Sequence, residues 1–316
     1  MASHYRFAFW NLENLFDIEG SPRRDDKVAR AIGSSIKGWT QALLDRKISQ
    51  LAGFIKTMNG GRGPDILGVC EVENRFVLEL LVQALAPLRR NYSIAHHDTQ
   101  DNRGIDVAFI YDNKKFVAEA TFNHFLMRRN ATRDILQVNF ITRKNRRFVM
   151  MGNHWPARSG GVLESAPYRA MAGETLAYFH ERVIEIHGKK TPVLAMGDFN
   201  DEPFDISLVD YALAARTEQK VIGGSNPYFF NLTWPLMGKG EGTYYYDGTH
   251  NFLDQILVNK YLLDPKALIK VKPSSVKILR PTDALIPIPF GGMGKKINQN
   301  GFSDHFAVEA AVTEED

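Results

Sequence analysis

The sequence predicts a mixed α and β fold in which sheets pack together and helices lie outside them. Short apolar runs typical of buried strands alternate with helix-period segments and with Gly, Pro and Asn turns along the whole chain. The strands gather in two clusters with helices between them, and such elements bury their apolar faces by stacking in layers. Because no fixed-period repeat or low-complexity linker interrupts this pattern, we expect residues 1–316 to form a single domain.

The first part of the chain contains two strands, each followed by a helix. Residues Tyr5–Trp10 are rich in aromatic side chains that fit a pleated surface, which predicts the first strand. The helix at Trp39–Met58 has apolar residues at helical spacing. A Gly- and Pro-rich turn follows it, then a strand at Asp65–Cys70 and a helix at Arg75–Leu88.

Strands dominate the middle of the chain, and the mixed pattern then repeats. The four middle strands are predicted at Ile105–Tyr111, Lys115–Phe122, Ile135–Ile141 and Arg147–Asn153. The second half is predicted to contain helices at Ser165–Ile186 and Ile206–Ala215, and strands at Pro192–Met196, Phe252–Val258 and His305–Val312. The Pro- and Gly-rich stretch Pro281–Gly301 is long for a compact domain, so we interpret it as a functional surface loop.

Composition excludes several classes of protein. Hydrophobic residues make up 44% of the 316 residues and charged residues 24%, which is ordinary globular usage and excludes disorder, collagen and coiled coil. The single cysteine, Cys70, excludes an intramolecular disulfide framework. The net charge of +3 is compatible with a phosphate-bearing substrate.

The chain has no apolar run of the roughly 20 residues that a membrane-spanning helix needs. We therefore expect a soluble protein with no stable membrane insertion, and a monomer. It would be cytoplasmic if the N-terminus is native, and secreted or periplasmic if a signal has been removed.

Polar residues gather at the C-terminal ends of the predicted strands and around the start of the last one. Taken singly, such a residue is more often a turn former or a helix cap than a ligand. Together they offer hard oxygen ligands, a Gly-Asp-Phe-Asn turn and two histidines, which suit a divalent cation and acid–base work on a phosphate ester. The set is Asn11, Glu71, Asn153, His154, Asp198, Asn200, Asp304 and His305.

These segments resemble the endonuclease/exonuclease/phosphatase superfamily, the deoxyribonuclease I-like group. The matching motifs occur in the family's order over nearly the whole chain. They are Trp10-Asn11, Asp65–Glu71, Asn153-His154, Gly197-Asp198-Phe199-Asn200, Asp254 within Phe252–Val258, and Ser303-Asp304-His305. The resemblance implies an α+β fold, a four-layer α/β/β/α sandwich with the site on one edge of its two central sheets.

The resemblance also implies roles for individual residues. Asn11, Glu71 and Asp304 look like the site of a bound Mg²⁺ or Mn²⁺, which would polarise the phosphoryl group. Asp198 and Asn200 look like the pair that positions the attacking water and holds a phosphate oxygen.

Two histidines complete the implied machinery. His305, oriented by Asp254, resembles the family's His–Asp pair beside the scissile phosphate. His154 would donate to a phosphate oxygen or help the leaving group. Whether Asp198 or His305 deprotonates the water stays open.

Other positions have two interpretations each. Glu73 would share a strand face with Glu71 as a second carboxylate ligand, and Asp106 would either orient His154 or pair with Arg103. We place Arg103 and Arg158 among the substrate-binding residues, with a plain surface arginine as the alternative for Arg158. Arg169 would likewise either bind phosphate or be a surface arginine. Asn14 would either support Asn11 or cap a turn.

Residues that differ from known branches of the family narrow the range of possible substrates. Met196 before Gly197 and Gln255 after Asp254 differ from inositol polyphosphate 5-phosphatases, and the segment from Asn153 to Gly161 is similar to a bacterial branch of unassigned substrate. The leading hypothesis is a Mg²⁺- or Mn²⁺-dependent phosphoesterase that cleaves phosphodiesters, with nucleic acid as substrate.

Two alternatives remain. The same machinery could hydrolyse a small phosphate ester or a phospholipid headgroup; a small substrate predicts a narrow pocket walled by loops such as Pro281–Gly301, whereas an endonuclease predicts Lys and Arg clustered around the site. A non-catalytic binding module is disfavoured because Glu71, Asp198 and His305 are all present.

Overall fold

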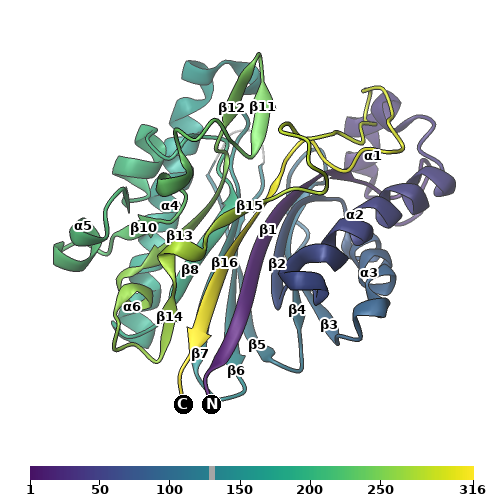
Figure 1. The fold of residues 1–316 in the computed structure, drawn as a ribbon. Coiled ribbons are helices and arrows are strands. Elements are labelled where there is room, and N and C mark those ends of the chain that lie inside the picture. Colours follow the sequence, from purple (N-terminus) through teal and green to yellow (C-terminus); the bar gives the residue numbers. More distant parts are fainter. Residues whose placement is uncertain (128–131) are drawn as a thin grey trace.

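Two large β-sheets lie face to face at the centre of the structure (Figure 1). The computed structural model of the chain describes residues 1–127 and 132–316, and within these each sheet has seven strands. The first sheet runs in the order β14 (Ile269–Val271), β16 (Ala307–Glu314), β1 (Ser3–Leu15), β2 (Ile66–Val72), β4 (Asp106–Asp112) and β3 (Tyr92–His96), and β15 (Lys277–Leu279) also pairs with β16.

The second sheet contains the middle strands of the chain. Its order is β5 (Phe116–His124), β6 (Ile135–Thr142), β7 (Arg147–His154), β8 (Val193–Asp198), β13 (Asp254–Asn259), β10 (Phe229–Asn231) and β9 (Ala214–Ala215). A separate two-stranded hairpin, β11 (Tyr244–Tyr246) and β12 (Thr249–Asn251), projects beyond the sheets at the end of the molecule opposite the two chain termini (Figure 1).

Helices cover the outer faces of both sheets. The helices are α1 (Asp26–Ile32), α2 (Gln41–Gly61), α3 (Arg75–Ala84), α4 (Val162–His187), α5 (Glu218–Gly223) and α6 (Lys260–Leu263). Side chains of α2 and α3 share one buried cluster with the first sheet, and side chains of α4 share another with the second. The layers are therefore helix, sheet, sheet and helix, which confirms the predicted four-layer sandwich.

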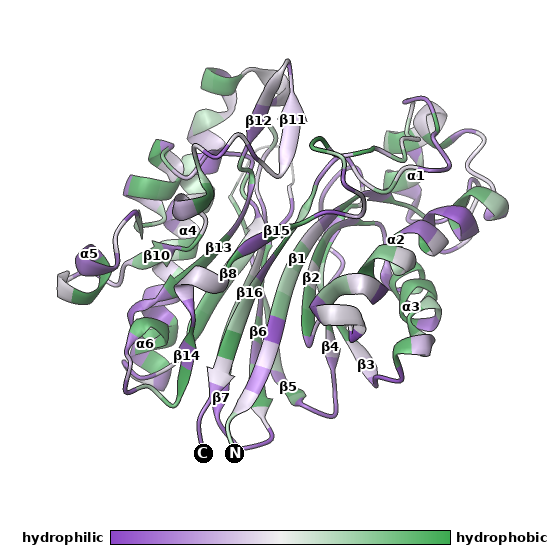
Figure 2. Cartoon of the chain, in the orientation of Figure 1, coloured by the Kyte–Doolittle hydropathy of each residue, from purple (hydrophilic) through white to green (hydrophobic). Residues whose placement is uncertain are grey.

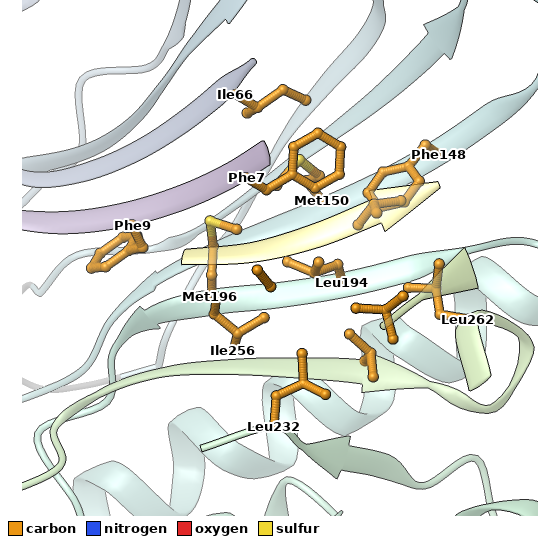
Figure 3. Packing of buried hydrophobic residues seen from close by; sticks show 14 of the residues in the cluster. Phe7, Phe9, Ile66, Phe148, Met150, Leu194, Met196, Leu232, Ile256 and Leu262 are labelled. Atoms are coloured by element: carbon orange, nitrogen blue, oxygen red, sulfur yellow. The ribbon is translucent and has the colours of Figure 1, made fainter. Parts of the chain in front are cut away.

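The main core lies between the two sheets. Figure 3 shows Phe7 and Ile66 of the first sheet facing Phe148, Met150 and Leu194 of the second. Figure 2 shows green hydrophobic stretches along the central strands and on the helices that cover them, whereas many of the connecting loops are purple or white. Removing this apolar surface from water is the main force that holds the layers together.

Several predicted boundaries are wrong in informative ways. The first strand continues past Trp10 to Leu15, and the helix at Trp39–Met58 begins at Gln41. The helix predicted at Ile206–Ala215 is a single π-helical turn followed by the two-residue strand β9. The last strand begins at Ala307, so Asp304 and His305 precede it instead of beginning it. Among the described residues, no helix is long and apolar enough to cross a membrane.

Candidate active site

Adjacent strands bring the predicted polar residues to one edge of the two sheets. Strands β1 and β2 run parallel, as do β7 and β8, so their carboxyl ends meet at the same edge. In the register of the second sheet, Asp198 lies opposite His154 on one side and opposite Asp254 on the other. Gly197 allows this close approach, because a Cβ there would lie 2.3 Å from the Asn153 carbonyl oxygen.

The chain leaves regular strand geometry where these side chains begin. Glu13, Asn14, Glu71 and Asn200 all have positive φ, between 50° and 60°. The pairing registers shift after Asn11 and after Cys70, and such bulges re-aim side chains at sheet edges. Left-handed backbone at non-glycine residues costs free energy and concentrates at functional sites. One result is that the Glu71 carboxylate Oε2 accepts the Asn14 backbone N–H at 3.0 Å.

His305 and Asp254 form a buried pair. The Nδ1 of His305 lies 2.7 Å from Oδ2 of Asp254, which is wholly buried. Burial acts to lower the pKa of His305, but the carboxylates of Asp254 and Asp198 raise it well above its usual value. These carboxylates favour the charged form of the imidazole, whose Nε2 lies 3.9 Å from an oxygen of Asp198. The backbone adds to the restraint, since the Trp10 indole donates to the His305 carbonyl at 2.9 Å.

Asp198 lies between the two histidines. Its Oδ1 accepts the backbone N–H of Asn200 at 2.9 Å, and its Oδ2 accepts the side-chain amide of Asn11 at 3.0 Å. Burial raises the pKa of Asp198 to about 6, and the charge on His305 opposes the rise. A carboxylate with such a pKa can exchange a proton near neutral pH.

The surroundings of His154 favour its neutral form. Its Nε2 lies 3.7 Å from a carboxylate oxygen of Glu71 and 3.7 Å from one of Asp198. Burial lowers the pKa of His154 well below its usual value, and the nearby charges of Arg133 and Arg103 act in the same direction. The pKa values of the two histidines on either side of Asp198 are thus shifted in opposite directions.

Glu71 and Asp304 are the carboxylates suited to a divalent cation. Their side chains are 16% and 20% exposed, whereas those of Asp198 and Asp254 are 2% or less. A hard cation such as Mg²⁺ keeps several waters and needs oxygen ligands that face solvent. The donor set therefore fits such an ion. Asn11 lies behind this pair, and its Oδ1 accepts the backbone N–H of Glu13 at 2.9 Å while retaining a second lone pair.

The predicted residues surround one cleft with a volume of about 690 Å³. Those that line it are Glu71, Arg103, His154, Arg158, Asp198, Asn200, Asp304 and His305. Asn11 and Asp254 lie behind it, hydrogen-bonded to Asp198 and His305. Segments from both ends and the middle of the chain thus converge on one centre.

The arginines have different surroundings. Arg158 lines the cleft, but its guanidinium already contacts Asp201 at 3.0 Å and Asp205 at 2.7 Å. Arg169 is buried and lies 2.7 Å from Asp201, so it is neither a surface arginine nor open to substrate. Arg103 is half-exposed and lies 3.9 Å from Asp101. Of the three, Arg103 has the most freely presented charge.

Two carboxylates expected near the centre have other partners. The side chain of Glu73 pairs with Arg24 at 2.6 Å and accepts the Asp17 backbone N–H, because β2 ends at Val72 and does not carry it beside Glu71. Asp106 lies 3.1 Å from His96 Nε2 and accepts the Thr99 N–H. Neither predicted contact of Asp106, with His154 or with Arg103, is found among the described residues.

A buried pair that the sequence did not predict lies beneath the site. Glu13 is wholly buried, and its carboxylate accepts the backbone N–H groups of Phe290 and Gly291 at 2.7 and 3.2 Å. Lys47, equally buried, donates to the Glu13 carbonyl. A signal was available, since Lys47 is a charged residue on the apolar face of the predicted Trp39–Met58 helix.

This pair ties the surface loop to the site. Through Glu13 the segment Pro281–Gly301 is held at its middle, at Phe290 and Gly291, and further along the same segment Lys295 lies 3.2 Å from Asp304. Lys295 was not among the predicted residues. No signal in the sequence distinguishes it from Lys296, because only the fold places its ammonium at Asp304.

Sequence comparison identifies the family. The sequence profile of the Endonuclease/Exonuclease/phosphatase family matches residues 6–314. The chain belongs to this family of phosphoric ester hydrolases, whose members depend on a divalent metal. No curated protein sequence matches the chain.

Solved structures of low sequence identity share the fold. A family protein from Bacteroides thetaiotaomicron has a TM-score of 0.61 at 16% identity, covering 100% of this chain and 99% of its own. The human Nocturnin catalytic domain with bound sulfate has a TM-score of 0.59 at 18% identity, covering 98% and 94%. D. rerio TDP2 complexed with a single-strand DNA product has a TM-score of 0.60 at 13% identity, covering 98% and 99%.

Proposed function

We propose that residues 1–316 act as one catalytic domain that hydrolyses phosphodiester bonds with Mg²⁺ or Mn²⁺, and that its substrate is nucleic acid. The observation that carries the proposal is the convergence of Glu71, Asp304, Asp198 and both histidines on one cleft. A soluble monomer is sufficient for this chemistry, because every proposed group comes from the same chain.

The metal would be held by Glu71 and Asp304, with the Asn11 amide oxygen as a third donor. When bound, such a cation polarises the phosphoryl group and offsets the charge that develops on it. Lys295 beside Asp304 adds a further positive charge at this edge. Glu71 has the strongest case, because its positive φ and its hydrogen bond from Asn14 fix the carboxylate at the cleft.

The chain's own residues would position and activate water. Asp198 and Asn200 would hold the water in line with the phosphorus, and the proton it loses would pass to the Asp198–His305 network, whose nearest atoms are 3.9 Å apart. As the new P–O bond forms, the bond to the leaving group breaks. His154, with an Nε2 that faces the cleft carboxylates, would donate to a phosphate oxygen or to the leaving oxygen.

Two observations favour nucleic acid over a small ester. Among the described residues that line the cleft, none belongs to Pro281–Gly301, so that loop does not wall in a narrow pocket. Arg103 presents a half-exposed guanidinium at the cleft, where an adjacent phosphate of a polymer would lie. The D. rerio TDP2 structure, a fold relative, is described as a complex with a single-strand DNA product.

The test is hydrolysis of supercoiled plasmid, of a duplex with an abasic site and of a generic phosphodiester. Each is assayed with Mg²⁺, with Mn²⁺ and with chelator, using the wild type and His305→Ala. Metal-dependent nicking that the variant lacks supports the proposal. Turnover of the generic ester alone points to a small or lipid phosphoester, and no metal-dependent turnover of any substrate contradicts the proposal.

A further inference from the structure

The hairpin β11–β12 places tyrosine rings over the catalytic cleft. Tyr244 and Tyr246 both line this cleft, and their rings are parallel within 10° with centroids 6.5 Å apart. Tyr246 is 68% exposed, the highest value of any tyrosine in the described residues. Tyr245 lies between them in sequence and points to the other face of the strand, where its ring centroid is 5.0 Å from that of His250.

The hairpin is fixed to the catalytic histidine. The ring of Tyr244 lies 4.7 Å from that of His305, and the two residues also form a β-bridge. Below it, the Thr243 hydroxyl accepts the backbone N–H groups of Leu253 and Asp254 at 3.1 and 3.0 Å. These contacts place Tyr244 and the beginning of the hairpin beside His305.

Apolar side chains line the same cleft as these rings. Leu253 and the half-exposed Val162 line the same cleft, whereas Glu71, Asp198 and Asp304 make its other surfaces acidic. A substrate that fills this cleft must present an ionised phosphate to one part and an apolar group to another. Nucleotides have this combination, because each phosphate is flanked by a planar base.

We propose that Tyr246 and Tyr244 form a stacking site for an unpaired nucleobase next to the scissile phosphate. This inference rests on the proposed function and specifies its substrate as nucleic acid with a single-stranded segment at the cleavage site. Base–aromatic stacking is tolerant of sequence, since every base has a π-face. A base within a continuous duplex is stacked and paired, and reaching the tyrosines would require its extrusion.

The experiment compares three variants on two single-stranded oligodeoxynucleotides. One oligonucleotide carries a base on each nucleotide, and the other has abasic nucleotides flanking the cleaved bond. Tyr246→Ala removes the proposed platform, and Tyr246→Phe retains the ring without its hydroxyl. The matched control is Tyr245→Ala, which removes a tyrosine from the same strand on the face turned away from the cleft.

We expect Tyr246→Ala to raise KM for the base-containing strand about 5- to 140-fold, the range for loss of one stacking contact. The same variant should leave KM for the abasic strand unchanged, while Tyr246→Phe and Tyr245→Ala should resemble the wild type on both strands. Fluorescence of 2-aminopurine at the flanking position gives an independent readout, because stacking quenches it when the wild type binds in chelator.

Two results would contradict the stacking site but not the proposed function. One is metal-dependent cleavage of both strands with equal KM by the wild type. The other is a loss in Tyr246→Ala that is equally large on the abasic strand or that Tyr245→Ala reproduces, which would show a structural role for the hairpin. Failure of the wild type to cleave any phosphodiester contradicts the proposed function instead.

Discussion

The buried histidine His180 makes the stability of the outer helix layer depend on pH. His180 lies on α4, is wholly buried, and stacks on Phe229 of the second sheet with ring centroids 4.0 Å apart. Burial lowers the pKa of His180 from 6.5 to about 3. Between these values the unfolded chain binds a proton that the folded protein does not, so stability falls as the pH falls below 6.5.

The size of this effect follows from the shift. Each unit of pH between the two pKa values is worth about 1.4 kcal/mol, so His180 contributes a loss of about 2.5 kcal/mol between pH 7.0 and pH 4.5. His180→Leu has a similar volume and cannot titrate. We expect the free energy of unfolding of the wild type to fall by about 2.5 kcal/mol more than that of the variant over this interval.

Urea unfolding followed by circular dichroism at the two pH values measures this difference. Other histidines with lowered pKa values, such as His124, contribute equally to both proteins and cancel. Metal-dependent activity at pH 7 serves as a folding control, because His180 does not line the proposed active-site cleft. Equal losses of stability in the two proteins would refute the reasoning.

Substitutions at three further positions test the centre and its support. Asp254→Asn removes the charge that orients His305, and kcat should fall at least about a hundredfold while Mn²⁺ still binds, measured by turnover and by Mn²⁺ titration. Unchanged kcat would contradict the His–Asp assignment. Glu13→Ala leaves the Phe290 and Gly291 N–H groups without an acceptor, which should lower the free energy of unfolding by about 2–4 kcal/mol and speed the hydrogen exchange of both groups. Glu13→Gln keeps one acceptor oxygen and should lose less stability. Unchanged exchange in Glu13→Ala would show that these two hydrogen bonds are unimportant. Gly197→Ala should destabilise the protein by more than 2 kcal/mol in urea unfolding, because its Cβ would meet the Asn153 carbonyl, and a neutral result would mean that β7 and β8 separate readily.

The sequence predicts the long elements well, and the reason is physical. The strands that became β2, β6 and β7 are buried on both faces, so their apolar runs are continuous and easily recognised. The short strands β3, β10, β14 and β15 and the hairpin β11–β12 were not predicted. Such segments are held by pairing to a neighbour already in place, and their own residues carry little periodicity.

The structure brings the central residues of the predicted site together, but it gives two of the outer carboxylates, Glu73 and Asp106, other partners. Residues such as His154 and Asp198 end strands whose order in the sheet brings them together, and motif order along the chain reflects that arrangement. Glu73 pairs with Arg24, which lies on a loop, and Asp106 pairs with His96, which lies on the unpredicted strand β3. Side-chain pairing of that kind depends on tertiary placement, which the local pattern does not contain.

The most direct test of the central claim is the metal dependence of phosphodiester hydrolysis in the wild type and in Glu71→Gln. The substitution keeps the shape of the side chain and the acceptor for Asn14, but removes the charge proposed to bind the cation. We predict hydrolysis that requires Mg²⁺ or Mn²⁺, stops with chelator, and in the variant needs at least about tenfold more metal for half-maximal rate. Hydrolysis that persists in chelator, or a variant with the metal requirement of the wild type, would contradict the account.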